Sequence, residues 1–299
     1  MMGSSNWPYR APRVELRSQG GEPGVFHLDG ANHPDRIQEM AERKIDISII
    51  NPSVLLTMAY RGSGAFEKPT QVATIAVMPH YDQLGFAVTE TSGIRSLDQI
   101  REQRFPLRVS VRGSLDASTT MLVDVVLKAH GFSLKDIVSW GGHVSYDQPM
   151  PNDVSRIGRV KSGELDAIFE EGIVMWGNIV SEAGMHFLPI DEPHLAKLEA
   201  QGFRRAMIKT ALYPSLPTDV PTVDFSGWPI FTHRDASDLL IRDFCEALEA
   251  RKQRIQWRIG DANQPPLPLE QMCKDTEETP LDVPFHPAAE RFWRERGYL

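Results

Sequence analysis

Two patterns of apolar residues alternate along the chain. Short, nearly continuous apolar runs, often β-branched, are typical of buried strands, and segments with apolar residues every three or four positions are typical of amphipathic helices. Their alternation predicts an α/β fold with largely parallel sheets and right-handed crossovers. The predicted strands are 14–18, 25–30, 45–50, 72–78, 84–88, 107–111, 137–140, 165–170 and 186–190. The main predicted helices are 34–44, 54–60, 96–102, 119–131, 154–163, 173–184, 239–252 and 287–299.

One unit of this pattern occurs twice. The stretches AERKIDISIINPS and VKSGELDAIFEEG each combine a charged helical end, an Asp and an apolar strand. The two acids, Asp46 and Asp166, sit at the predicted helix-to-strand turns, where a carboxylate can accept hydrogen bonds from backbone N–H groups. We therefore expect a structural role for both acids and one copy of the unit in each of two lobes.

The ends of the predicted strands carry small and polar residues. Ligands of open parallel sheets bind beyond the carboxyl ends of the strands, and a cleft between two lobes is a common site for a small molecule. Two facing lobes are therefore expected to bind a ligand through these strand ends. The predicted ligand-binding residues are Asn51, Ser53, Gly113, Ser114, Ser118, Thr119, Trp140, Glu170, Glu171 and Tyr213.

Each group in this set has a functional and a structural interpretation. Free N–H groups and hydroxyls of the loop from Gly113 to Thr119 can hold an anion such as a carboxylate, or Asp116 or Ser118 can simply cap the following helix. Glu170 or Glu171 can pair with a ligand ammonium or favour the dipole of the next helix. The aromatic residues suit an organic ligand or an ordinary core.

Composition changes this picture little. The chain has 299 residues, 41% hydrophobic and 24% charged, which suits a globular protein of one large or two medium domains. A net charge of −8 gives no basic footprint for nucleic acid. No apolar run has the length of a membrane helix, so direct membrane insertion is not expected. The first residues do not read as a secretory signal, which leaves a cytoplasmic location as an alternative to an exported one.

Catalytic, metal and cofactor motifs do not emerge. The sequence has no G-x-S-x-G elbow, no H-E-x-x-H and no glycine-rich loop for a nucleotide. Its two cysteines, Cys245 and Cys273, lack metal-site spacing, and we expect them to be unbonded. No cofactor, metal or catalytic residue is therefore predicted.

The chain resembles the TAXI family, the solute-binding receptors of TRAP transporters, through several short stretches in order. They are ERKIDISIIN, LGFAVTETSGIRSLDQIREQRFPLRVSVRGSLDAS, VLKAHGF, VKSGELDAIF, ALYPSLPTDVPTVDFSGWPIFTHRDASDLLIRDFCEAL and PFHPAAERFWRERGYL. The resemblance implies a two-lobed type II periplasmic-binding-protein fold with a hinge near 84–88 and 187–191. The repeated unit and the strand that runs into TETSGI predict residues 1–88 and 189–299 in the first lobe and 89–188 in the second. The resemblance also implies a periplasmic location and a TRAP-type membrane permease as partner.

The function expected on these grounds is capture of a small organic acid or amino acid for a transporter. Two alternatives remain open at this point. One is an enzyme on the same fold, such as a decarboxylase or hydrolase acting on an aromatic or other organic acid. The other is a cytoplasmic ligand sensor.

Overall fold

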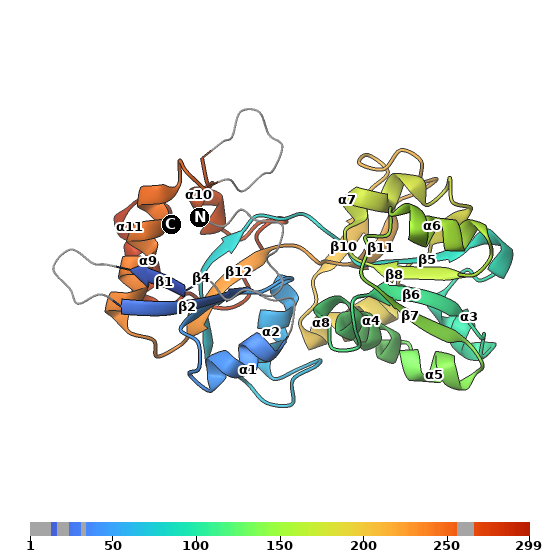
Figure 1. Cartoon of the computed structure of the whole chain (residues 1–299), viewed down its shortest axis with the longest axis horizontal. Helices are drawn as coiled ribbons and strands as arrows, with labels where there is room; N and C mark the ends of the chain where they lie inside the picture. The colour runs from blue at the N-terminus through green and yellow to red at the C-terminus, as the bar shows by residue number, and fades with distance from the viewer. Residues whose placement is uncertain (1–12, 17–23, 31–33, 256–265) are drawn as a thin grey trace. The chain divides into compact units, whose positions relative to one another are not determined.

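The computed structural model describes residues 13–16, 24–30, 34–255 and 266–299, with side-chain positions from residue 34 onward. Most of the N-terminal segment that does not read as a secretory signal therefore lies outside the described residues. The chain divides into two compact units (Figure 1). The first unit comprises residues 1–61, 68–81 and 226–299, and the second comprises 62–67 and 82–225. Asp46 and Asp166 accordingly fall in different units, as the repeated pattern predicts.

The first unit is built on a five-stranded sheet in the order β1-β2-β3-β12-β4. Helices α1 and α2 contact the strands β12 and β4, while α9 and α11 pack on each other at the opposite side of the unit (Figure 1). The strands are β1 (Arg13–Leu16), β2 (Gly24–Gly30), β3 (Ile47–Ile49), β4 (Val72–Met78) and β12 (Trp228–His233). The helices are α1 (Asp35–Ala41), α2 (Ser53–Arg61), α9 (Asp238–Arg251), α10 (Leu269–Met272) and α11 (Pro287–Glu295).

The second unit is built on another five-stranded sheet, in the order β7-β6-β8-β5-β9, with a separate β10-β11 ribbon. The strands are β5 (Gly85–Thr89), β6 (Arg108–Arg112), β7 (His143–Asp147), β8 (Ala167–Glu170), β9 (Met185–Phe187), β10 (Arg205–Ile208) and β11 (Val220–Val223). The helices are η2 (Glu90–Ser92), α3 (Leu97–Glu102), α4 (Ser118–Ala129), α5 (Leu134–Ser139), α6 (Val154–Lys161), α7 (Ile173–Trp176), η3 (Gly177–Ile179) and α8 (Glu192–Gln201).

The expectation of mostly parallel sheets is wrong for both units. In the first sheet only β2 and β3 pair in parallel, and β12 lies antiparallel between β3 and β4. In the second, β6 is parallel to β7 and β8, but β5 is antiparallel to β8 and β9. The reason is the chain path: β12 and β5 follow crossings between the units, so neither is reached through a right-handed crossover helix.

The boundaries of the units also differ from the predicted ones. Residues 82–88 and 189–225 belong with the second unit, and the long crossings lie at 81/82 and 225/226. Strand β5 pairs with β8 and β9, which ties it to the second sheet. The β10-β11 ribbon packs there too, since Ile190 N donates to Pro221 O at 2.9 Å and Leu84 N donates to Val223 O at 3.2 Å.

A second correction concerns the segment 137–140, predicted as a strand. Residues 137–139 complete α5, Trp140 is its C-cap residue, and Ser133 opens the helix with a capping box made with Asp136. The strand comes later, as β7, where neither a strand nor a helix is predicted from the sequence. Local capping outweighs the β-branched character of Ile137 and Val138 here.

The two repeated acids differ in what they do. The Asp166 carboxylate accepts from the backbone N–H of Arg108 at 3.0 Å and from its guanidinium at 2.8 Å, which joins the approach to β8 to the start of β6. Asp46 is exposed, and its backbone carbonyl accepts from the Thr232 hydroxyl at 2.7 Å. The structural role is therefore confirmed for the Asp166 side chain.

The C-terminal segment forms a closing helix, as predicted. Phe292 and Trp293 of α11 are fully buried in the core of the first unit, and the Trp293 indole N–H donates to Ile75 O at 2.7 Å. Cys245 and Cys273 are buried in the same core as free thiols, and burial raises the pKa of each.

Shortening one core side chain of α11 tests this packing. We expect Phe292→Ala to lower the free energy of unfolding by about 3–5 kcal/mol, because it leaves a cavity in a close-packed core. Urea denaturation measures the change. Arg294→Ala, at an exposed position of the same helix, is the control and should stay within about 0.5 kcal/mol of the parent. Equal destabilisation by the two variants would contradict the assigned core.

Candidate functional site

The polar groups of the second unit gather at one edge of its sheet. The parallel strands β6, β7 and β8 end together, at Arg112, Asp147 and Glu170. Strand β5 runs the opposite way and begins at this edge, where Gly85 pairs with Glu170. The two residues that approach β5, Asp82 and Gln83, therefore reach the same edge.

A buried ion-pair cluster holds this edge together. The Glu170 side chain has no exposed surface and lies 2.8 Å from Arg156 Nη1 and 3.1 Å from Arg112 Nε. Arg112 also reaches Glu171 Oε1 with its Nη2 at 3.0 Å. Burial raises the pKa of Glu170, and the two guanidinium groups oppose that rise. Because these partners already neutralise Glu170, it is poorly placed to take a ligand ammonium.

The guanidinium group of Arg156 has N–H donors at this edge that the described residues leave without a hydrogen-bond partner. Arg156 is 1% exposed, and its Nη1 also donates to Pro149 O at 2.9 Å. Among the residues that the structure describes, its Nε and Nη2 have no hydrogen-bond partner, although Nε lies 4.0 Å from Asp147 Oδ2. Buried polar groups normally have partners, so these N–H groups suit an acid group of a ligand.

Asp82 fixes the turn into α7. Its Oδ2 accepts from Gly172 N at 2.7 Å, and its Oδ1 accepts from Ile173 N at 2.9 Å and from Gln83 N at 2.8 Å. Burial, reinforced by the nearby negative charge of Glu171, raises the pKa of Asp82 well above its usual value. The next side chain, Gln83, is buried with neither amide atom hydrogen-bonded within the described part of the chain.

The loop after β6 opens α4 without a side-chain cap. Gly113, at φ +71°, makes the turn, and Ala117 is the N-cap residue with no side-chain hydrogen bond. The alternative in which Ser118 caps the helix is therefore not what the structure has, and the Ser114 hydroxyl donates to Asp116. Ser118 Oγ is buried with no partner among the described residues, and Thr119 is buried beside it.

The first unit has a smaller polar edge of its own. Asn51 follows β3, joined to Pro52 by a cis peptide bond, and Ser53 begins α2. Both side chains are buried, and neither Asn51 Oδ1 nor Ser53 Oγ has a hydrogen-bond partner in the described ranges. Gly227 is required beside them, because a Cβ there would lie 2.5 Å from Ser53 Oγ.

Two predicted aromatic residues lie elsewhere. Trp140 ends α5, ahead of β7, and packs on Phe132 with ring centroids 5.8 Å apart. Because residues 137–139 are helical and β7 begins only at His143, Trp140 lies before the start of that strand rather than at the carboxyl end of a strand. Tyr213 is 5% exposed in the apolar core, where it closely approaches Gly177. Trp140 is therefore not at the polar edge of the sheet, and Tyr213 packs in the core that includes Ile173 and Trp176 of α7.

Four residues of this edge were missed from the sequence: Asp82, Gln83, Arg112 and Arg156. Arg112 carried a usable signal, since a charged residue ends an apolar strand directly before a glycine loop. Asp82 and Gln83 precede a buried strand, and no sequence pattern distinguishes them from residues of an ordinary connection. Arg156 lies on an amphipathic helix whose polar residues normally face solvent. Its burial depends on the position of Glu170, which the sequence does not reveal.

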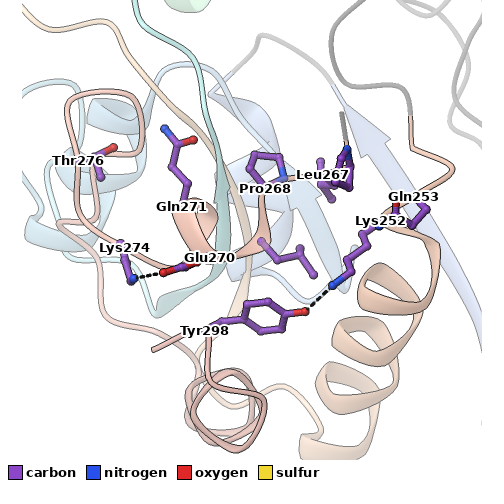
Figure 2. Close-up of a pocket in the computed structure, with 11 residues that line it drawn as sticks. Lys252, Gln253, Leu267, Pro268, Glu270, Gln271, Lys274, Thr276 and Tyr298 are labelled. Atoms are coloured by element: carbon purple, nitrogen blue, oxygen red, sulfur yellow. Dashed lines mark hydrogen bonds and ion pairs between the residues drawn. The ribbon is translucent and has the colours of Figure 1, made fainter. Parts of the chain in front are cut away.

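Two hollows in the described part of the chain are lined by residues other than Arg156, Gln83 and Ser118. A cavity of about 550 Å³ in the first unit is lined by residues including Lys252, Glu270, Lys274 and Tyr298 (Figure 2). Its cations are paired, Lys252 with the Tyr298 hydroxyl at 3.0 Å and Lys274 with Glu270 at 2.6 Å. A cavity of about 300 Å³ beside α4 in the second unit is lined by residues including Leu115 and Thr120.

Among the described helices, none combines the length and the apolar character that a membrane-spanning helix requires.

The raised pKa of Asp82 gives a pH dependence with a definite sign. The folded chain binds this proton more tightly than the unfolded chain, where an Asp has a pKa of about 3.9. The contribution of Asp82 to stability is therefore present below about pH 4 and is lost as pH rises through the folded pKa.

Asp82→Asn tests this linkage because it removes the titrating group. Urea denaturation from about pH 4 to pH 7 should show the advantage of the parent over this variant shrinking as pH rises. Asp153→Asn is the control, since its carboxyl has a lowered pKa and titrates below that range. A parent-to-variant difference that does not change with pH would contradict the assignment to Asp82.

Comparisons with known proteins give a family for the chain. Among solved structures, PhnD1 from Prochlorococcus marinus in complex with methylphosphonate is 11% identical, with 90% of this chain and 84% of that chain covered and a TM-score of 0.41. The alkanesulfonate-binding protein SsuA from Xanthomonas axonopodis pv. citri is 12% identical, with a TM-score of 0.35; the match covers 74% of this chain and 59% of the SsuA chain. Similarity at this level assigns neither ligand nor site residues. The model of the NMT1-like family matches residues 30–297, and the chain belongs to that family.

Proposed function

We propose that this protein binds a small organic acid or amino acid as a solute-binding protein. The observation that carries the proposal is the polar edge of the second unit, where Arg156, Gln83 and Ser118 are buried with hydrogen-bonding atoms that the described residues leave unused. A protein seldom buries such atoms without a partner, and a bound ligand or water supplies one.

The chemistry of the edge favours an acid group on the ligand. The N-cap residue of α4, Ala117, makes no side-chain hydrogen bond to the helix, and N–H groups of a helix N-terminus favour an anion. Arg156 adds a buried guanidinium, and the Ser118 hydroxyl adds a further donor. Glu171, with a side chain 15% exposed, is the acid best placed to meet a ligand ammonium. These groups together suit an amino acid or another small carboxylate.

We further propose that the protein serves transport, by delivering its solute to a membrane permease. This role is supported by the resemblance of the sequence to the TAXI receptors, which implies delivery of the solute to a TRAP-type membrane permease from the periplasm. Co-purification of the tagged chain with such a permease from native membranes, in the presence of the identified solute, tests the partner. Fractionation of the same cells tests the compartment, and recovery in the cytosol alone would oppose this role.

Binding itself is tested by a thermal-shift screen of the full chain over organic acids and amino acids. A ligand present at a hundred times its Kd should add about 2.7 kcal/mol to the free energy of unfolding. Calorimetry then gives the Kd of each hit. A screen in which no acid or amino acid raises the melting temperature would count against the proposal.

Removing hydroxyls from the loop tests where that ligand binds. We expect Ser118→Ala and Thr119→Ala each to weaken binding by about 1–3 kcal/mol, because each takes a buried partner from the acid group. The melting temperature of the empty protein should change little, since Ser118 Oγ has no partner within the described residues. Ser139→Ala is the matched control, since its hydroxyl donates to Asp136 O at 2.7 Å within α5.

Asn51→Ala and Ser53→Ala, measured in the same way, test the polar edge of the first unit. Asn51 Oδ1 and Ser53 Oγ are buried and lack partners in the described chain, so loss of affinity without loss of stability would mark them as ligand contacts.

Unchanged affinity in the Ser118, Thr119 double variant would place the site elsewhere and leave those residues as plain helix-terminal groups.

A further inference from the structure

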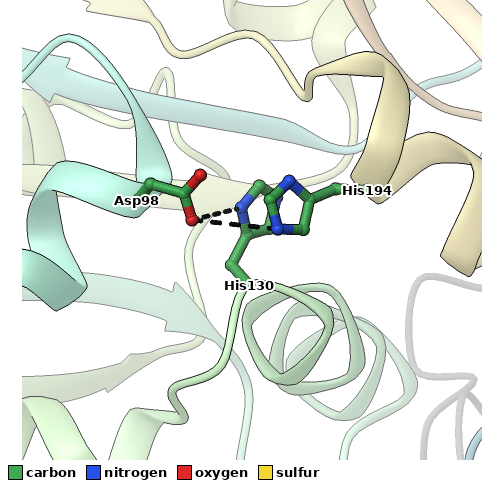
Figure 3. A group of neighbouring side chains, drawn as sticks. All are labelled: Asp98, His130 and His194. Carbon is green, nitrogen blue, oxygen red and sulfur yellow. Dashed lines mark hydrogen bonds and ion pairs between the residues drawn. The ribbon is translucent and has the colours of Figure 1, made fainter.

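Three side chains far apart in the sequence meet in the second unit, outside the polar edge described above. They are Asp98 on α3, His130 at the C-terminus of α4 and His194 on α8 (Figure 3). One ligand atom from each lies within 4.8 Å of the others. Both histidines are buried, and the Asp98 side chain is 27% exposed. The proposed solute-binding function makes no use of this cluster.

The distances fit a metal site better than a hydrogen-bonded one. Asp98 Oδ1 lies 3.4 Å from His130 Nδ1 and 3.8 Å from His194 Nε2. Normal hydrogen bonds between N and O are about 2.7–3.2 Å, so both contacts are long for that purpose. A tetrahedral Zn²⁺ with ligands at about 2.0–2.2 Å has neighbouring ligand atoms about 3.3–3.6 Å apart.

The surroundings also resemble those of a metal-ligating histidine. His194 Nδ1 is hydrogen-bonded to Asp191 Oδ1, so the other ring nitrogen, Nε2, is left to face Asp98. A carboxylate behind a ligating histidine fixes the orientation of its ring in this way. His130 Nε2 is buried without a partner among the described residues.

We propose that Asp98, His130 and His194 bind a divalent transition-metal ion of the Zn²⁺ class, with Asp191 positioning His194. Two imidazoles and one carboxylate are a donor set that Zn²⁺ accepts, and they leave one position for water. The imidazole rings are now stacked, with centroids 3.7 Å apart and planes at 18°, so ion binding turns them until both nitrogens face one point. The ion would tie together α3, the end of α4 and the start of α8.

One neighbouring cation opposes the ion. Arg101 Nη2 lies 3.6 Å from Asp98 Oδ1, and its Nη1 donates to His130 O at 2.9 Å. Asp98 and Asp191 together carry more negative charge than this one guanidinium offsets. Arg101→Gln should therefore tighten metal binding, which a purely structural cluster does not predict.

The test uses the full chain, freed of metal with a chelator and then titrated with Co²⁺. Visible d–d bands of a low-coordinate Co²⁺ ion should appear, saturate, and disappear when Zn²⁺ is added. Asp191→Asn should weaken the affinity about ten- to a hundredfold, as loss of a carboxylate behind a ligand does. His194→Gln should abolish the bands, and His143→Gln, at an exposed histidine of β7, is the control that should retain them.

Far-UV circular dichroism shows whether each variant is folded. If His194→Gln fails to fold, Asp98→Asn replaces it, because that side chain is partly exposed and its removal leaves the histidine stack in place. Absence of the bands in the parent, or bands that persist in a folded ligand variant, would overturn the proposal and leave a stacked histidine pair beside an aspartate.

Discussion

The second unit depends on the neutralisation of one buried carboxylate. Glu170 ends the central strand β8 with no exposed surface, which is tolerable only because Arg156 and Arg112 lie at 2.8 and 3.1 Å. Arg112 belongs to the end of β6 and Arg156 to α6, so the pairing ties two strand ends and a helix to one point. Removal of either arginine would leave charge unpaired in the interior, whereas removal of an exposed ion pair costs little.

This constraint also shapes what a ligand would meet. The ion pairs use the charge of Glu170 internally but leave part of Arg156 without partners, and Asp82 holds the adjacent turn by accepting three backbone hydrogen bonds. The edge is therefore ordered before any ligand arrives, and its unused groups are mostly donors. Preorganised donors around a buried cation favour an anionic group, because little further ordering is needed when it binds.

The cluster of Asp98, His130 and His194 obeys different physics. It lies where three helices meet, Asp98 faces both rings at long distances, and the two rings stack on each other, while His194 Nδ1 is hydrogen-bonded to Asp191. At the polar edge, ion pairs with Arg156 and Arg112 neutralise the charge of Glu170, whereas in this cluster the Asp98 carboxylate faces both imidazole rings. The two features are therefore separable by experiment: solute affinity reports on one and metal affinity on the other.

The sequence alone determined the elements whose signal is local. Periodicity located α4, β6, β8 and the closing helix α11, and it placed Asn51, Ser53 and Ser118 at strand and helix ends, where their buried atoms lack partners in the described chain. It also predicted a structural role for Asp166, although the backbone N–H from which its carboxylate accepts belongs to Arg108 on β6, a partner that the turn itself does not indicate.

The tertiary structure decided what depends on chain crossings and distant partners. In the structure β5 and β12 are antiparallel to their neighbours. Residues 137–139 are helical, so Trp140 does not lie at a strand end, and Tyr213 lies in the core. The tertiary structure buried Arg156 against a glutamate 14 residues away and brought His194 to a histidine 64 positions earlier. Apolar periodicity reports which face of an element is buried, but which charges meet inside depends on how the elements pack, and that is written in no single segment.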